Sequence, residues 1–105
     1  MDDKPSKDGL TSAVQRTAWH PLRIHHERDA LWVVDTGLDL VTAAMGVVED
    51  QIEAVGYWIQ TGRMRKPTEP EVEAWEMDAQ AERFVFLIVQ PFVLVKEQEV
   101  DASSV

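Results

Sequence analysis

The chain has 105 residues, of which 45% are hydrophobic and 28% are charged, so it can form one folded domain with a buried core. Its formal net charge of −9 argues against general binding to nucleic acids or anionic membranes, because both attract basic surfaces. The chain has no cysteine, which excludes disulfides, thiolate catalysis and cysteine-ligated metal centres. The first residues lack the apolar core of a signal peptide, and no apolar run is long enough to span a membrane, so we expect a cytoplasmic protein.

The first third of the chain combines short helical and extended patterns. Residues 1–7 are polar and are expected to be flexible. Apolar residues at helical spacing predict a first helix over 8–18, and Pro21 suits the first turn of a second helix over 21–28. The run 30–35 is short, apolar and β-branched, which is typical of a buried central strand.

The stretch 38–61 is the longest predicted element, and we expect the rest of the fold to pack around it. Its apolar residues fall within one arc of roughly 140° when the chain is drawn as a helix of ~3.6 residues per turn. Thr36 and Asp39 form a capping pattern at its start, and Gly62 suits a left-handed cap at its end. The predicted buried stripe consists of Leu40, Val41, Ala44, Val47, Val48, Ile52, Val55, Trp58 and Ile59.

Shorter patterns follow this stretch. Basic and apolar residues alternate over 63–66, which favours a short edge strand whose charges discourage aggregation. Thr68 and Glu71 form a capping box, which predicts the start of a helix that reaches about residue 81. This helix would direct Trp75 inward.

The last part of the chain has the strongest β character. Residues 84–89 and 92–96 predict two strands. Pro91 removes a backbone donor between them, and the residues leave open whether Gln90–Pro91 forms a tight hairpin or a kink. The acidic segment 98–105 is expected to be flexible.

Together these patterns predict a single α+β domain over residues 8–97. We expect a small mixed sheet of three to four short strands with about four helices, packed mainly on one face of the sheet.

The residues also carry a resemblance. The chain resembles a family of short bacterial proteins of unknown function, over about residues 10–97. That resemblance implies no activity, cofactor or partner. The residues that carry it are Trp19, Leu22, Leu31–Asp35, Leu38–Val41, Glu49, Asp50, Trp58, Ile59, Gly62, Trp75 and Val89–Val95.

Two carboxylates are the candidate metal or acid–base residues. Asp35 ends a predicted strand and Asp39 begins the long predicted helix, so both lie at one strand-to-helix junction. They could hold a magnesium ion or act as an acid–base pair. Alternatively, Asp39 caps the helix and Asp35 ends the strand, and we favour this structural role.

The candidate interaction residues are one tryptophan and three cations. Trp32 alternates with Val33 along a predicted strand, so it either meets a second helical layer or lies on an exposed surface. Arg63, Arg65 and Lys66 could bind a phosphate or an acidic partner, or they could simply pair with nearby glutamates on a solvated edge strand.

The sequence contains no catalytic motif that we can identify. It lacks a nucleophile elbow, a phosphate-binding glycine loop and a dinucleotide fingerprint, and its three histidines have no metal-binding spacing. We therefore expect no catalytic residues and no cofactor. The preferred hypothesis is a non-catalytic protein-interaction or regulatory domain, whose partner is another protein or a second copy of the chain. The alternative is a small metal-dependent enzyme or ligand-binding protein that uses Asp35 and Asp39, and a weaker third is nucleic-acid binding through the three cations.

Overall fold

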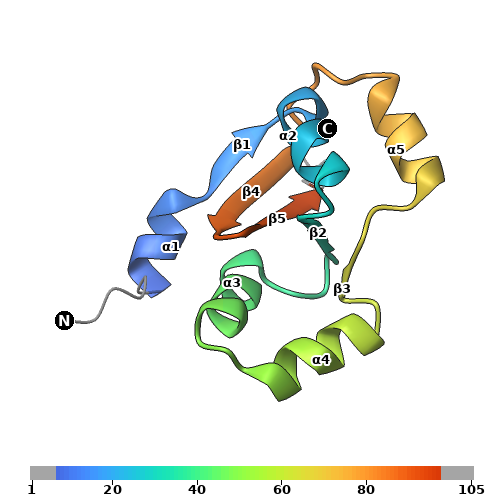
Figure 1. Cartoon of the computed structure of the whole chain (residues 1–105). Coiled ribbons are helices and arrows are strands. Elements are labelled where there is room, and N and C mark those ends of the chain that lie inside the picture. The colour runs from blue at the N-terminus through green and yellow to red at the C-terminus, as the bar shows by residue number, and fades with distance from the viewer. Residues whose placement is uncertain (1–6, 98–105) are drawn as a thin grey trace.

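The computed structural model describes residues 7–97, so the segments predicted to be flexible, 1–7 and 98–105, lie outside the described residues except for Lys7. This part of the chain contains five helices and five strands (Figure 1). Within it, no helix combines the length and apolar character that crossing a membrane would need. In chain order the elements are α1 (Lys7–Ala13), β1 (Gln15–Thr17), α2 (Trp19–Glu27), β2 (Leu31–Val34), α3 (Leu40–Val48), α4 (Ile52–Gln60), β3 (Met64–Arg65), α5 (Glu69–Glu76), β4 (Phe84–Val89) and β5 (Phe92–Glu97).

The strands form one mixed sheet in the order β1-β4-β5-β2-β3. Strand β2 runs parallel to β5, and the other neighbouring pairs are antiparallel. The α+β class and the mixed sheet are thus confirmed, but residues 7–97 form five strands and five helices rather than three to four strands and about four helices. The additional strand is β1, which we predicted as the end of a helix. It pairs with β4, with Arg16 opposite Val85, and a local pattern cannot reveal a partner so distant in the sequence.

Helices cover both faces of the sheet, so the prediction that they pack mainly on one face is wrong. Figure 1 shows the sheet with α2 and α5 toward one end of the molecule and α3 and α4 toward the other. One core, the aromatic core, joins α2 and α5 to one face of the sheet and consists of Trp19, Leu22, Leu31, Val33, Trp75, Phe84, Val93 and Val95. The other, the aliphatic core, joins α1 and α3 to the opposite face and consists of Leu10, Val34, Leu38, Leu40, Val41, Ala43, Ala44, Met64, Leu87, Val89 and Leu94.

The two cores follow from the pleat of the central strands. Successive side chains of a strand point to opposite faces, so Val33 belongs to the aromatic core and Val34 to the aliphatic core. Likewise Val93 and Leu94 of β5 divide between the two cores. A continuous apolar run is what a strand buried on both faces requires.

The predicted single helix over 38–61 is wrong, because the chain forms α3 and α4 with a break between them. Asp50 has a φ of 53°, in the left-handed region. The amide of Asp50 donates to the carbonyl of Val47 (3.2 Å), and that of Gln51 donates to the carbonyl of Gly46 (2.9 Å). These two bonds form a Schellman cap, in which aspartate takes the position where glycine is usual. The same type of cap ends α4, where Gly62 has a φ of 79° as predicted.

Local signals give the other boundaries with small shifts. Asp39, rather than Thr36, caps α3, because its Oδ2 accepts from the amide of Thr42 (3.0 Å). The capping box of Thr68 and Glu71 is confirmed, although α5 ends at Glu76 rather than near residue 81. The question about Gln90–Pro91 is also answered: β4 and β5 form a hairpin in which Val89 pairs with Phe92, and the bond before Pro91 is cis.

Candidate functional site: an apolar groove beside α4

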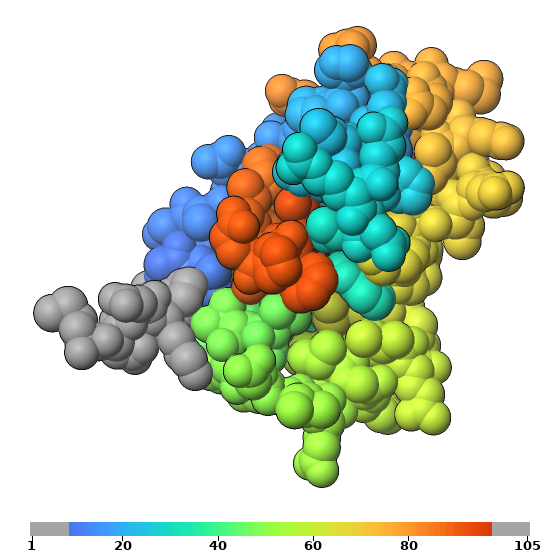
Figure 2. All heavy atoms as spheres, viewed as in Figure 1, coloured from blue at the N-terminus to red at the C-terminus, as the bar shows by residue number. Residues whose placement is uncertain are grey.

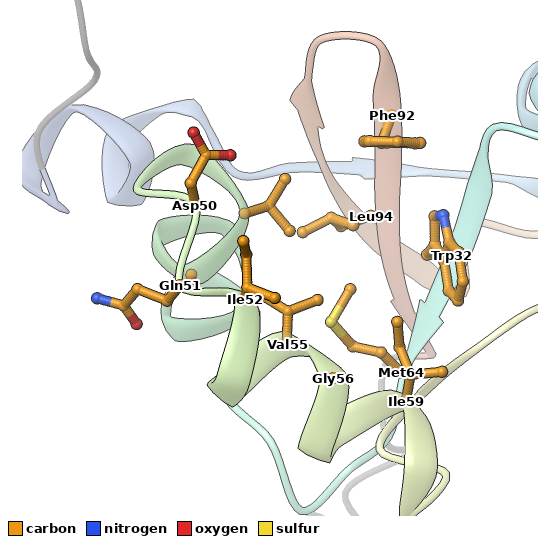
Figure 3. Close-up of a pocket in the computed structure, with 12 residues that line it drawn as sticks. Trp32, Asp50, Gln51, Ile52, Val55, Gly56, Ile59, Met64, Phe92 and Leu94 are labelled. Carbon is orange, nitrogen blue, oxygen red and sulfur yellow. The ribbon is translucent and has the colours of Figure 1, made fainter.

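An apolar groove of about 360 Å³ lies between α4 and the sheet (Figure 3). It is at the end of the molecule formed by α3 and α4, which is coloured green to yellow-green in Figure 2. One wall is the stripe of α4 formed by Ile52, Val55, Gly56 and Ile59. These positions follow the i, i+3, i+4, i+7 spacing that places side chains on one face of a helix. The α4 stripe, as we name these four residues, is therefore a continuous apolar surface.

Strands β2, β3 and β5 supply the opposite side of the groove. Trp32, Met64, Phe92 and Leu94 line it, and Figure 3 shows Phe92 and Trp32 across the groove from α4. Met64 and Leu94 are buried, whereas Trp32 and Phe92 are half-buried at its edge. The volume falls within the roughly 300–1,000 Å³ that is usual for a binding pocket.

The α4 stripe is largely exposed, contrary to our expectation that Ile52 and Ile59 belong to the core. Ile52 is 81% exposed and Ile59 is 43% exposed. The reason is the Schellman cap at Asp50, which turns α4 away from the direction of α3, so that the apolar stripes of the two helices are no longer continuous. No residue of α4 is fully buried.

Trp58 attaches α4 to α3. A Cβ atom placed on Gly46 of α3 would lie 2.6 Å from Cζ3 of Trp58 and 3.3 Å from a methyl group of Val55. Only glycine leaves space for an indole ring this close to the helix backbone. The prediction that Trp58 faces inward is therefore correct in direction, although its side chain is half-buried rather than central.

The two ends of the groove differ in charge. Asp50 and Gln51 lie at one end, where α3 gives way to α4, and Trp32 lies at the other (Figure 3). Near Trp32, the Nζ atom of Lys66 stands 4.5 Å from the centre of the indole ring and donates to the carbonyl and carboxylate of Asp29 (2.6 and 2.9 Å). Such a cation over an aromatic face is attracted by the ring quadrupole.

The remaining predicted cations separate. The guanidinium of Arg63 lies 5.8 Å from the centre of the Tyr57 ring on α4. Arg65 lies apart from the groove and forms two hydrogen bonds with Glu71 of α5 (2.6 and 2.7 Å). Those bonds raise the pKa of Arg65 and lower the pKa of Glu71, because each stabilises the charged form of its partner. The structure thus places Trp32 and Lys66 at one end of the groove, Arg63 beside Tyr57 of α4, and Arg65 in a structural ion pair.

The two candidate metal-binding carboxylates have local roles. Asp35 accepts from the amide of Gly37 (3.2 Å), and Asp39 accepts from the amide and hydroxyl of Thr42 (3.0 and 3.2 Å). Within residues 7–97, no group of three or more histidine, aspartate or glutamate side chains could hold a metal ion. These bonds are those of a strand end and a helix cap, the structural role that we favoured for them.

Sequence reasoning missed the groove because it placed Ile52 and Ile59 in the core. An amphipathic stripe indicates that a helix face avoids water, but not whether the same chain covers it. Phe92 was assigned only to a strand. The one signal in the sequence was Asp50, which lies two residues after the apolar run that ends at Val48 and tolerates the left-handed conformation that a helix break needs.

Comparisons with known proteins give a family and one related fold. A family model described as "Protein of unknown function (DUF2288)" matches residues 5–97. The chain is similar to the NMR solution structure of PA1075 from Pseudomonas aeruginosa, with 27% sequence identity and a TM-score of 0.74, over 97% of this chain and 94% of that one. No curated protein matches the chain. The expected resemblance to a family of unknown function is confirmed.

Proposed function

Because this chain belongs to the DUF2288 family of proteins of unknown function, its activity has to be inferred from the groove, and we propose that it is a non-catalytic protein-interaction domain. The groove beside α4 is its binding surface, and the occupant is an apolar helical segment of a protein.

The observation that supports this proposal most directly is the exposure of the α4 stripe opposite Trp32. Soluble proteins seldom leave large aliphatic and aromatic side chains together in water, and contiguous apolar patches mark interaction sites. Ile52 at 81% exposure gains little from packing within its own chain. Tryptophan is also among the residues that most often dominate binding energy, and Trp32 lines this surface.

The strongest charge pairs of the described chain lie away from the groove. Their hydrogen bonds raise the pKa of Arg23 and Arg65 and lower the pKa of Glu71 and Glu76. All four belong to ion pairs that attach α5 to α2 and β3, away from the groove.

A crosslinking experiment tests the proposal. We would place a photo-crosslinking amino acid at position 52 of the full chain, illuminate cells that produce it, and identify the protein joined to it by mass spectrometry. The matched variants are Ile59→Glu in the groove and Ile24→Glu on α2, since the two isoleucines are 43% and 48% exposed on helices of nine residues.

We expect one defined protein adduct, which Ile59→Glu abolishes and Ile24→Glu leaves intact. Its identity, whether another protein or the chain itself, comes from the peptide masses. The proposal is contradicted if no protein is joined at position 52, or if Ile59→Glu and Ile24→Glu give the same yield of adduct.

A further inference from the structure

The shape of the α4 stripe identifies an occupant, on the premise that the groove is a protein-binding surface. From the symmetry of the stripe we infer that the occupant is α4 of a second copy of the chain, which lies antiparallel to α4 across the mouth of the groove. The two copies would be related by a two-fold axis, the commonest arrangement of protein dimers.

The stripe is its own complement in an antiparallel pair. Its four positions are arranged symmetrically about the midpoint between Val55 and Gly56. Turning one helix end for end places Ile52 opposite Ile59 of the second copy, and Val55 opposite Gly56 of the second copy. A two-fold interface needs this property, because each surface must fit a copy of itself.

Gly56 gives the second copy room to approach. A Cβ atom built on Gly56 would find no other atom within 4 Å, so the position is an open notch in the surface of α4. The side chain of Val55 from the second copy fits such a notch in the way that ridges of one helix enter the grooves of another. The notch lies at the axis, where two helices approach most closely.

The charges are complementary in the same orientation. Glu49 and Asp50 precede α4, and Arg63 follows it. None of these three has an ion-pair partner within residues 7–97. An antiparallel pair brings Arg63 of each copy to the end where Glu49 and Asp50 of the other lie, whereas a parallel pair would set like charges side by side. A lipid or another apolar molecule would leave these charges unused.

The first test is the association of the purified chain by sedimentation equilibrium. We expect a concentration-dependent dimer, because the contact is small and the net charge of −9 opposes association at low salt. Gly56→Leu should abolish the dimer while the monomer stays folded, since a Cβ atom at this position meets no other atom within 4 Å in one copy. Ile24→Glu should leave the dimer unchanged.

The second test exchanges the charges. Arg63→Glu and Glu49→Lys should each weaken the homodimer by about tenfold, since each creates two like-charge contacts in place of two favourable ones. Mixing the two variants should restore association, because the mixed dimer contains two attractive pairs. If the two copies associated through another surface, mixing the two charge variants would not restore association.

Three results would overturn the inference. The wild-type chain could stay monomeric up to about 1 mM, where weak contacts are still measurable. It could associate without any effect of Gly56→Leu, or the mixture of charge variants could associate no better than each alone. If the chain is monomeric and position 52 still crosslinks to a different protein, the interaction function stands and the second copy is not its occupant.

Discussion

The indole ring of Trp58 occupies the space beside Gly46 that a Cβ atom would need, since a Cβ on Gly46 would lie 2.6 Å from Cζ3 of Trp58. This contact attaches α4 to α3, and α4 has no fully buried residue of its own and leaves Ile52 in water. The orientation of α4, and with it the shape of the groove, depends on a glycine in the neighbouring helix.

Gly46→Ala should therefore destabilise the protein. Alanine is a better helix former than glycine by about 1 kcal/mol, but overpacking costs typically about 1–3 kcal/mol, and the rigid ring so close to the new methyl group makes the clash prevail. The measurement is urea unfolding in dilute protein.

Gly56→Ala is the matched control in a helix of equal length. The new Cβ meets no atom within 4 Å, so only helix propensity acts, and stability should rise by about 0.5–1 kcal/mol. Opposite signs for the two substitutions are the expected result. A rise in stability with Gly46→Ala as large as that with Gly56→Ala would contradict the packing of Trp58 on α3.

The free energy of unfolding should also fall at acid pH, because the carboxyl of Glu71 becomes protonated there. Its hydrogen bonds from Arg65, and then those from Thr68, lower the pKa of its carboxyl from the ordinary 4.5. A carboxyl whose pKa is lower in the folded state than in the unfolded state stabilises the fold at pH values above its ordinary pKa. This stabilisation is lost as the pH falls through the pKa of the folded state. Since the pair is partly exposed, we expect a contribution of about 0.2–1 kcal/mol at neutral pH.

Glu71→Gln isolates this contribution, because glutamine also serves in a capping box while lacking the charge. The free energies of unfolding of wild type and variant should differ near pH 7 and converge below the ordinary carboxyl pKa. If the gap between wild type and Glu71→Gln stays constant with pH, the ion pair contributes nothing to stability.

Two tryptophans with different burial should respond differently to truncation. Trp75 is 3% exposed, and its ring centre lies 5.1 Å from that of Trp19 and 5.0 Å from that of Phe84. Trp75→Ala should cost about 3–5 kcal/mol, as is usual for an aromatic residue removed from a core.

Trp32→Ala should cost only about 1 kcal/mol, from lost partial burial and the contact with Lys66, but it should reduce binding in the groove. Chemical denaturation measures the loss of stability in each variant, and the crosslinking yield at position 52 measures the loss of binding.

Much of the fold was predictable because its signals are local. The strand over 84–89 coincides with β4, and the capping box of Thr68 and Glu71 is present, since a few neighbouring residues determine each feature. Strand β1 was not predictable, because three residues carry no clear alternation and their partner β4 is distant in the sequence.

The candidate site was predictable only in part. Trp32 and Lys66 were candidates for an interaction surface, and the structure places them together at one end of the groove. Nothing in the sequence separated Arg63 from Arg65, which pairs with Glu71 only because α5 packs beside β3. The break at Asp50 was missed because glycine is the expected residue there. The left-handed φ of Asp50 ends α3, and the apolar stripe that follows on α4 is therefore exposed instead of buried in the core.

The last prediction concerns Asp39, the residue on which the metal hypothesis depends. Its Oδ2 atom accepts from the amide of Thr42 at 3.0 Å, so Asp39→Ala should cost about 0.5–2 kcal/mol, while Asp39→Asn should cost little because asparagine caps equally well. Thermal unfolding of both variants, with and without magnesium or manganese, measures this. If Asp39 is a helix cap, the Tm should fall from wild type to Asp39→Asn to Asp39→Ala, with or without the metal. A cation site would instead raise the Tm of the wild type alone, because Asp39→Asn removes the charge that a hard cation needs.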